Sequence, residues 1–151
     1  MKRRNFIQAM MGGAAALLLM PINALAAIWN KAAFESTTLQ GAVKGLQIPA
    51  ENPNTNRSAD IEIIAPDKAE NGAVVQIEVT SRIPNTEAIA ILVEKNPTPL
   101  IANFMFSNGA EPYVVTRIKM AETSDVQAII KVGNEYFKAS RRVEVLENGC
   151  N

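Results

Sequence analysis

The run VQAIIKVGNEYF at residues 126–137 decides the fold. Every second residue from 126 to 132 is apolar, and the polar residues Gln127 and Lys131 fall between them, as a strand with one buried face requires. Gly133-Asn134 then marks a two-residue turn, and residues 135–137 begin a returning strand. The run therefore predicts a tight antiparallel hairpin.

Turn residues also separate the predicted strands on the N-terminal side of this hairpin. There, short apolar or alternating runs are divided by Gly, Pro, Asn and Asp. Seven short strands at roughly ten-residue spacing indicate a mainly β protein, an immunoglobulin-like antiparallel β-sandwich with a short N-terminal helical segment. The expected strands are 60–65, 73–80, 87–95, 99–106, 112–120, 125–132 and 135–146.

One expected strand contains a continuously apolar stretch, Ala88–Val93. Such a stretch fits a strand that is buried on both faces, or one that a partner covers. We assign Ile89, Ile91 and Val93 to the core rather than to an interface, because burial is the commoner fate of such residues.

The segment 28–46 has apolar residues at spacings of three and four. This predicts one amphipathic helix, or two short helices broken near Ser36-Thr37-Thr38. Trp29 and Phe34 are interpreted as core-facing rather than as a ligand or partner site. Residues 49–59 read as a polar loop.

The N-terminus has the pattern of an export signal. Basic residues at positions 2–4 precede an uncharged stretch, and Ala24-Leu25-Ala26 provides the small–x–small pattern for cleavage. Arg3-Arg4-Asn5-Phe6-Ile7 resembles a twin-arginine signal, which exports folded proteins, here to the periplasm. The alternatives are a retained N-terminal anchor and a chance Arg-Arg pair in a general secretory signal.

The predicted organisation has four parts. Residues 1–26 form the signal peptide, 27–59 the helical segment and polar loop, 60–146 the sandwich, and 147–151 a flexible C-terminal arm. Beyond residue 26 the chain holds 12 basic and 15 acidic residues, a formal net charge of −3. Nucleic acid is therefore not an expected partner, and no stable membrane association is expected after processing.

Composition excludes most active sites. The chain has no histidine, which removes Ser-His-Asp and Cys-His catalysis and histidine metal ligands. It has one cysteine, so it forms no internal disulfide, and its glycines make no phosphate-binding loop. We expect no catalytic residue, no metal site, no cofactor and no enzymatic activity of its own.

The cysteine, Cys150, is one residue from the end of this chain, within the arm residues Asn148, Gly149 and Asn151. An odd thiol in an oxidising compartment is typically reactive or forms an intermolecular disulfide. A carrier thiol on a tether is the favoured interpretation, because glycine frees the backbone before it. A disulfide-linked dimer and an incidental thiol remain as alternatives.

Several runs resemble the SoxY family, the sulfur-carrying subunits of bacterial thiosulfate oxidation. They are IAP at 64–66, AENGAVV at 69–75, IAILVEKNPTPL at 89–100 and TRIKMAETS at 116–124. The resemblance implies an immunoglobulin-like sandwich that pairs with a SoxZ-like subunit. It also implies that thiosulfate is conjugated to Cys150 by a c-type cytochrome, and that a sulfate-releasing hydrolase and a sulfur dehydrogenase then process it.

One departure from the family is at the arm. SoxY proteins typically end Gly-Gly-Cys-Gly-Gly, whereas this chain ends Asn148-Gly149-Cys150-Asn151. Asparagine adds bulk and restricts the backbone, and a terminal carboxylate near the thiol is expected to raise its pKa. Both effects would slow conjugation. The alternative function is therefore a non-catalytic β-sandwich interaction module, a diverged SoxY-like protein without carrier activity.

Overall fold

The computed structural model describes residues 30–49, 53–107 and 109–147. The predicted signal peptide, Trp29 and Cys150 with its neighbours lie outside these residues. The chain divides into two units, Met1–Asn30 and Lys31–Asn151, and all described helices and strands belong to the second.

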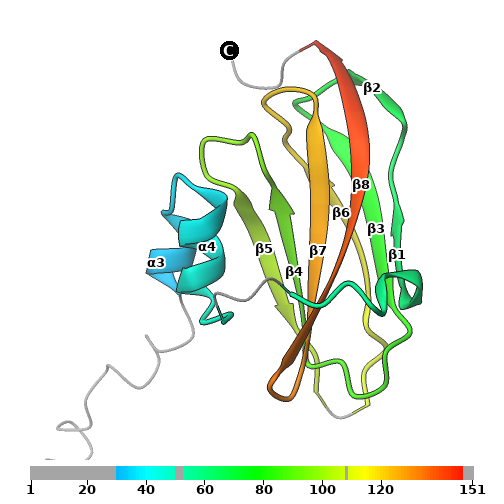
Figure 1. Cartoon of the computed structure of the whole chain (residues 1–151). Helices are drawn as coiled ribbons and strands as arrows, with labels where there is room; N and C mark the ends of the chain where they lie inside the picture. Colours follow the sequence, from blue (N-terminus) through cyan, green and yellow to red (C-terminus); the bar gives the residue numbers. More distant parts are fainter. Residues whose placement is uncertain (1–29, 50–52, 108, 148–151) are drawn as a thin grey trace, which may run out of the picture. The chain divides into compact units, whose positions relative to one another are not determined.

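The second unit is a sandwich of two β-sheets (Figure 1). The three-stranded sheet has the order β1-β3-β6 and the five-stranded sheet the order β2-β8-β7-β4-β5. The mainly β sandwich expected from the sequence is thus confirmed. The strands are β1 Ile61–Ile64, β2 Lys68–Asn71, β3 Val75–Ser81, β4 Ala88–Val93, β5 Leu100–Met105, β6 Tyr113–Ile118, β7 Ser124–Val132 and β8 Glu135–Glu147.

All seven expected strands are present, with ends within two residues of the predicted ones. The sequence analysis missed β2, a four-residue edge strand of which only Ala69 is buried. Its run has no apolar alternation that would mark it as a strand. It also pairs parallel with β8, so the sandwich is not wholly antiparallel as predicted.

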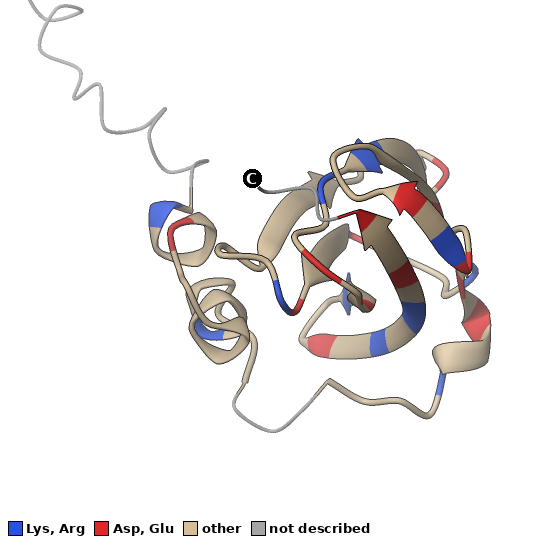
Figure 2. Ribbon diagram, turned by 90° about the horizontal axis from the view of Figure 1, so that it is seen from above, with Lys and Arg blue, Asp and Glu red and all other residues tan. Residues whose placement is uncertain are grey.

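The predicted hairpin at residues 126–137 joins β7 to β8, with Val132 opposite Glu135. Gly133, the first loop residue, has a φ of 56°, whereas the second, Asn134, does not have a positive φ, which is the pattern of a type II′ turn. Charged residues of both signs are interspersed along the strands rather than gathered by sign (Figure 2).

Strand β4 is buried on both faces. Ile89, Ile91 and Val93 are fully buried in the core between the sheets, as expected. On the other face, Ala90 and Leu92 belong to a second apolar cluster that includes helix residues. This chain therefore covers the outer face of β4 with its own N-terminal segment.

Two short helices form that cover, α3 Lys31–Phe34 and α4 Leu39–Gly45, which confirms the broken-helix alternative. The break is fixed at Thr38, whose Oγ1 accepts a hydrogen bond from the N–H of Gly41 at 3.1 Å. Phe34 packs against the second cluster, as predicted. A 3₁₀ turn, η1 Ser58–Asp60, occupies the end of the expected polar loop.

Candidate functional site

The described part of the candidate site is the end of β8, from which the C-terminal arm continues. Strand β8 runs through Glu147, so this residue belongs to the sheet and not to the arm as predicted. Glu147 pairs with Asn71 of β2, and its carbonyl accepts a hydrogen bond from the N–H of Gly72 at 2.8 Å. The four residues 148–151 lie outside the described structure.

The end of β8 is held along both edges. On one edge β2 runs parallel to it, and Lys68 Nζ lies 3.1 Å from Glu144 Oε2. On the other edge, Thr123 Oγ1 accepts a hydrogen bond from the N–H of Val145 at 2.8 Å. The threonine thereby replaces the strand partner that β8 lacks beyond Val143, because β7 begins at Ser124.

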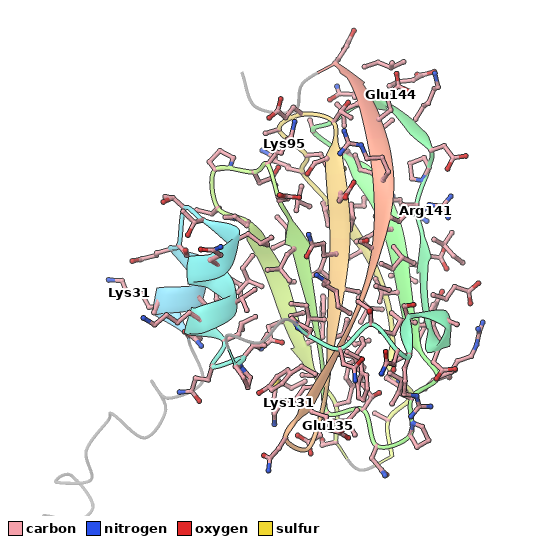
Figure 3. All side chains as sticks on the ribbon, in the orientation of Figure 1. Lys31, Lys95, Lys131, Glu135, Arg141 and Glu144 are labelled. Atoms are coloured by element: carbon pink, nitrogen blue, oxygen red, sulfur yellow. The ribbon has the colours of Figure 1, made fainter. Side chains whose placement is uncertain are left out.

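Charged residues surround this end of the sandwich. Figure 3 places Lys95 and Glu144 there, and Lys131 and Glu135 at the opposite end. Lys95 pairs with Glu122 at 3.8 Å, and Arg142 with Asp125 at 3.2 Å. These pairs are solvent-exposed, so each adds little stability.

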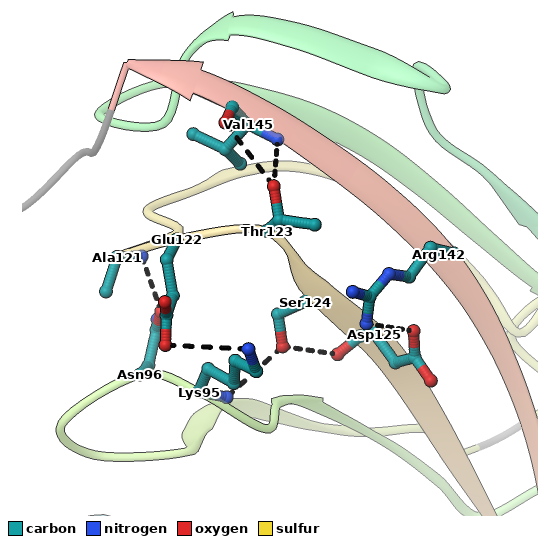
Figure 4. Close-up of polar contacts among 9 residues, drawn as sticks. All are labelled: Lys95, Asn96, Ala121, Glu122, Thr123, Ser124, Asp125, Arg142 and Val145. Carbon is teal, nitrogen blue, oxygen red and sulfur yellow. Dashed lines mark hydrogen bonds and ion pairs between the residues drawn. The ribbon is translucent and has the colours of Figure 1, made fainter.

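Buried polar contacts fix the loops beneath these charges (Figure 4). Asn96, in the loop after β4, is 9% exposed and reaches across to the loop after β6. Its Nδ2 donates to the carbonyl of Lys119 at 2.7 Å, and its Oδ1 accepts from the N–H of Ala121 at 2.8 Å. The two loops therefore act as one support next to Thr123.

The sequence analysis missed Gly72, Asn96 and Thr123 as parts of this support. Asn96 precedes Pro97 and reads as an ordinary turn residue. Its partners, Lys119 and Ala121, lie 23 and 25 residues away, beyond the reach of local patterns.

Two hydrogen-bonded pairs away from the end of β8 have shifted pKa values. A hydrogen bond from Lys131, and then its charge, lower the pKa of Glu87, and the same hydrogen bond raises the pKa of Lys131. Tyr113 donates a hydrogen bond to Glu78 at 2.8 Å, which raises the pKa of the phenol.

Two further properties of the described residues bear on function. No helix among them has the length and apolar composition needed to cross a bilayer. Within the same ranges, no three or more His, Cys, Asp or Glu side chains converge as a possible metal site.

Comparison with known proteins identifies the family of the chain. The family of the sulfur oxidation protein SoxY matches residues 48–150, which include the sandwich and Cys150. The chain belongs to the SoxY family. The sulfur carrier protein SoxY from Chlorobium limicola f thiosulfatophilum is 31% identical, with a TM-score of 0.64. The match covers 75% of this chain and 96% of that one, and it confirms the predicted immunoglobulin-like fold.

Other similarities are much weaker. An engineered protein matches with 8% identity and a TM-score of 0.40, over 58% of this chain and 20% of its own. A lytic polysaccharide monooxygenase from Jonesia denitrificans matches with 17% identity and a TM-score of 0.38, over 73% and 72%. No curated protein sequence matches significantly. Because the chain belongs to the SoxY family, it has a sulfur-carrier role in the Sox system, which includes partner proteins such as SoxZ.

Proposed function

We propose that this SoxY protein carries thiosulfate-derived sulfur covalently on Cys150 in the periplasm, while partner enzymes process it. The observation that carries the proposal is the extent of the family match, which runs to Cys150, the single cysteine of the chain. Neither histidine nor a second thiol competes with it as a reactive group. The carrier itself performs no turnover.

The support at the end of β8 gives the proposed arm a defined origin. From Glu147 to Cys150 the chain advances three residues, which span at most about 11 Å when extended. A thiol at that distance enters another protein's active site while the sandwich stays outside. Gly149 provides a residue without a Cβ next to the thiol.

The proposed cycle needs chemistry from partners. A c-type cytochrome joins the outer sulfur of thiosulfate to Sγ of Cys150, and it takes up two electrons as the thiol proton is released. A hydrolase then adds water to the bound sulfonate group, which releases sulfate and leaves a persulfide on Cys150. A sulfur dehydrogenase oxidises the remaining sulfur, and a SoxZ-like subunit accompanies the carrier. The twin-arginine-type signal supports export of the folded chain.

Intact-mass analysis tests the proposal. The protein lacking residues 1–26 is incubated with thiosulfate and the conjugating cytochrome, as wild type and as Cys150→Ser. We expect a thiosulfate adduct on the wild type alone, and the same circular-dichroism spectrum for both proteins. An adduct on Cys150→Ser would contradict the assignment. Intact SoxZ-like binding without any adduct on the wild type would instead favour the interaction-module alternative, which the Asn-Gly-Cys-Asn ending keeps open.

A further inference from the structure

The two edges of the five-stranded sheet differ in how far other segments of the chain cover their backbone groups. The edge at β8 is covered along much of its length, by β2 at one end and by Asn54 at the other. The N–H of Asn54 donates to the carbonyl of Tyr136 at 2.8 Å, and its carbonyl accepts from the N–H of Lys138 at 3.0 Å. The covering strand β2 is itself only four residues long and contains Lys68 and Glu70.

The other edge is β5, which is contacted by α3, and its first residue, Leu100, packs in the second apolar cluster with helix residues. Among the described strands, none pairs with the outer side of β5. Its sequence, LIANFM at Leu100–Met105, contains no charged residue, no proline and no glycine. Sheet edges in monomeric proteins are normally blunted by short length, charge, proline or a covering segment, because unpaired backbone groups are a template for another strand. An uncharged six-residue edge strand is therefore typical of an interaction site.

The antiparallel register identifies the free backbone groups. The N–H of Phe106 donates a hydrogen bond to the carbonyl of Glu87, and Phe104 lies opposite Ile89. The backbone N–H and C=O groups of Phe104 and Phe106 therefore point toward β4. Because the direction alternates along a strand, the backbone groups of Asn103 and Met105 face away from β4. Among the described backbone hydrogen bonds that lie outside the regular strand pairs, none is donated by the N–H of either residue.

Side chains at this edge also suit a protein partner. Met105 is 69% exposed, and its sulfur contacts Asn103 Nδ2 at 3.9 Å. Ile101 and Phe104 are only partly buried against the core. Methionine and phenylalanine are enriched at protein interfaces, where charged residues are depleted.

The edges of the three-stranded sheet are less suited to pairing. Strand β1 has four residues, and its Glu62 is engaged by Arg82. Strand β6 is as long as β5 but contains Arg117. Of the four sheet edges that the structure describes, β5 is the one that combines length with the absence of charge.

We propose that β5 accepts an extended, uncharged strand from a different protein subunit, which adds a sixth strand to the five-stranded sheet. Backbone N–H and C=O groups select an extended strand as the occupant, and the neutral side chains select an uncharged one. The chain beyond residue 26 has a net charge of −3, so long-range electrostatics favour a neutral or basic partner over a second copy. A partner with a neutral or basic surface is not repelled.

The inference rests on the carrier role with a partner subunit, and not on the chemistry at Cys150. The probe is a purified SoxZ-like subunit, titrated against the protein lacking residues 1–26. We expect Met105→Lys to weaken binding about tenfold or more, because a charge enters the strand interface. Val115→Lys, at a 52% exposed position on β6, is the matched control and leaves binding within about twofold. Both variants keep the wild-type circular-dichroism spectrum, and both still take the thiosulfate adduct.

Amide hydrogen exchange by NMR provides a second readout on the unmodified chain. On addition of the subunit, the amides of Asn103 and Met105 become protected, whereas that of Phe104, already bonded toward β4, changes little. Unchanged exchange at Asn103 and Met105 in the saturated complex would overturn the proposal. So would protection of these amides in the chain alone at high concentration, which would assign the edge to a second copy. Loss of binding in Val115→Lys but not in Met105→Lys would place the partner on the three-stranded sheet and overturn it as well.

Discussion

The N–H of Gly72 donates a hydrogen bond to the carbonyl oxygen of Glu147 at 2.8 Å, and so ties the end of β8 to the turn between β2 and β3. The carbonyl of Gly72 in turn accepts a hydrogen bond from the N–H of Met120, a fully buried residue, at 2.7 Å. One glycine therefore connects the end of β8 to the loop after β6. The point at which residues 148–151 begin is set by the core of the sandwich.

Replacing Thr123 with valine tests this support. Thr123→Val keeps the shape of the side chain but leaves the N–H of Val145 without its 2.8 Å acceptor. We expect the free energy of unfolding to fall by about 1–2 kcal/mol, the typical cost of an unpaired, partly buried donor. Urea denaturation measures the change, and exchange of the Val145 amide becomes faster.

The matched control is Thr98→Val, which makes the same change at an exposed position on the neighbouring loop. We expect it to change the unfolding free energy by less than about 0.5 kcal/mol. Equal effects of the two substitutions would show that the Thr123 hydroxyl does not hold β8.

Contact between the two helices gives a second prediction. Alanine normally stabilises a helix by about 1 kcal/mol relative to glycine. At Gly45, however, an added Cβ would lie 2.5 Å from the Cα of Ala33. Gly45→Ala is therefore expected to destabilise the protein by about 1–3 kcal/mol through overpacking.

Urea denaturation followed by circular dichroism measures the loss. Gln40→Ala, at an exposed position of the same helix, is the control and leaves the midpoint nearly unchanged. Stabilisation by Gly45→Ala would mean that the two helices do not pack this closely.

Local patterns predicted the parts of the fold that depend on near neighbours. The hairpin at Gly133 follows from alternation and turn chemistry, and the burial of Ile89 follows from a continuous apolar run. Strand β2 could not be predicted, because it forms only by pairing with β8, about 75 residues away, and its one buried side chain is Ala69. The same limit applies to Asn96, whose role depends on distant carbonyl and amide groups.

The candidate site also has one part that the sequence could predict and one part that it could not. Cys150 could be singled out from composition, since it is the one thiol in a chain without histidine. The support for its arm could not, because Gly72 and Thr123 act on β8 through contacts between distant segments. No composition or spacing rule marks such residues.

The ion pair at the hairpin end of the sandwich gives a pH-dependent prediction. Lys131 Nζ lies 2.6 Å from Glu87 Oε2, and this contact lowers the pKa of Glu87. A carboxylate with a lowered pKa in the folded state stabilises the protein above its unfolded pKa, and this contribution is lost as the pH falls through its folded pKa. The coupling between Glu87 and Lys131 is therefore expected to shrink from neutral to acid pH.

A double-mutant cycle with Glu87→Gln and Lys131→Met measures the coupling at pH 7 and pH 3. Because both side chains are partly exposed, 1 M NaCl also reduces it. Glu135→Gln, at an exposed carboxylate on the same hairpin, replaces Glu87→Gln in a control cycle and shows little coupling to Lys131. A coupling that is unchanged at pH 3 would contradict the assigned cause of the shift.

The arm provides the last prediction. Asn148→Gly restores one glycine of the family's usual ending and removes a side chain two residues before Cys150. Glycine samples more backbone conformations than asparagine, so under the proposed carrier role we expect the thiol to reach the conjugating enzyme's active site more readily. We expect a higher rate of thiosulfate adduct formation at limiting carrier concentration, measured by intact mass over time. Asn134→Gly, in the hairpin at the opposite end of β8, makes the same replacement and leaves the rate unchanged. Equal rates for wild type and Asn148→Gly would show that asparagine at this position does not hinder the carrier.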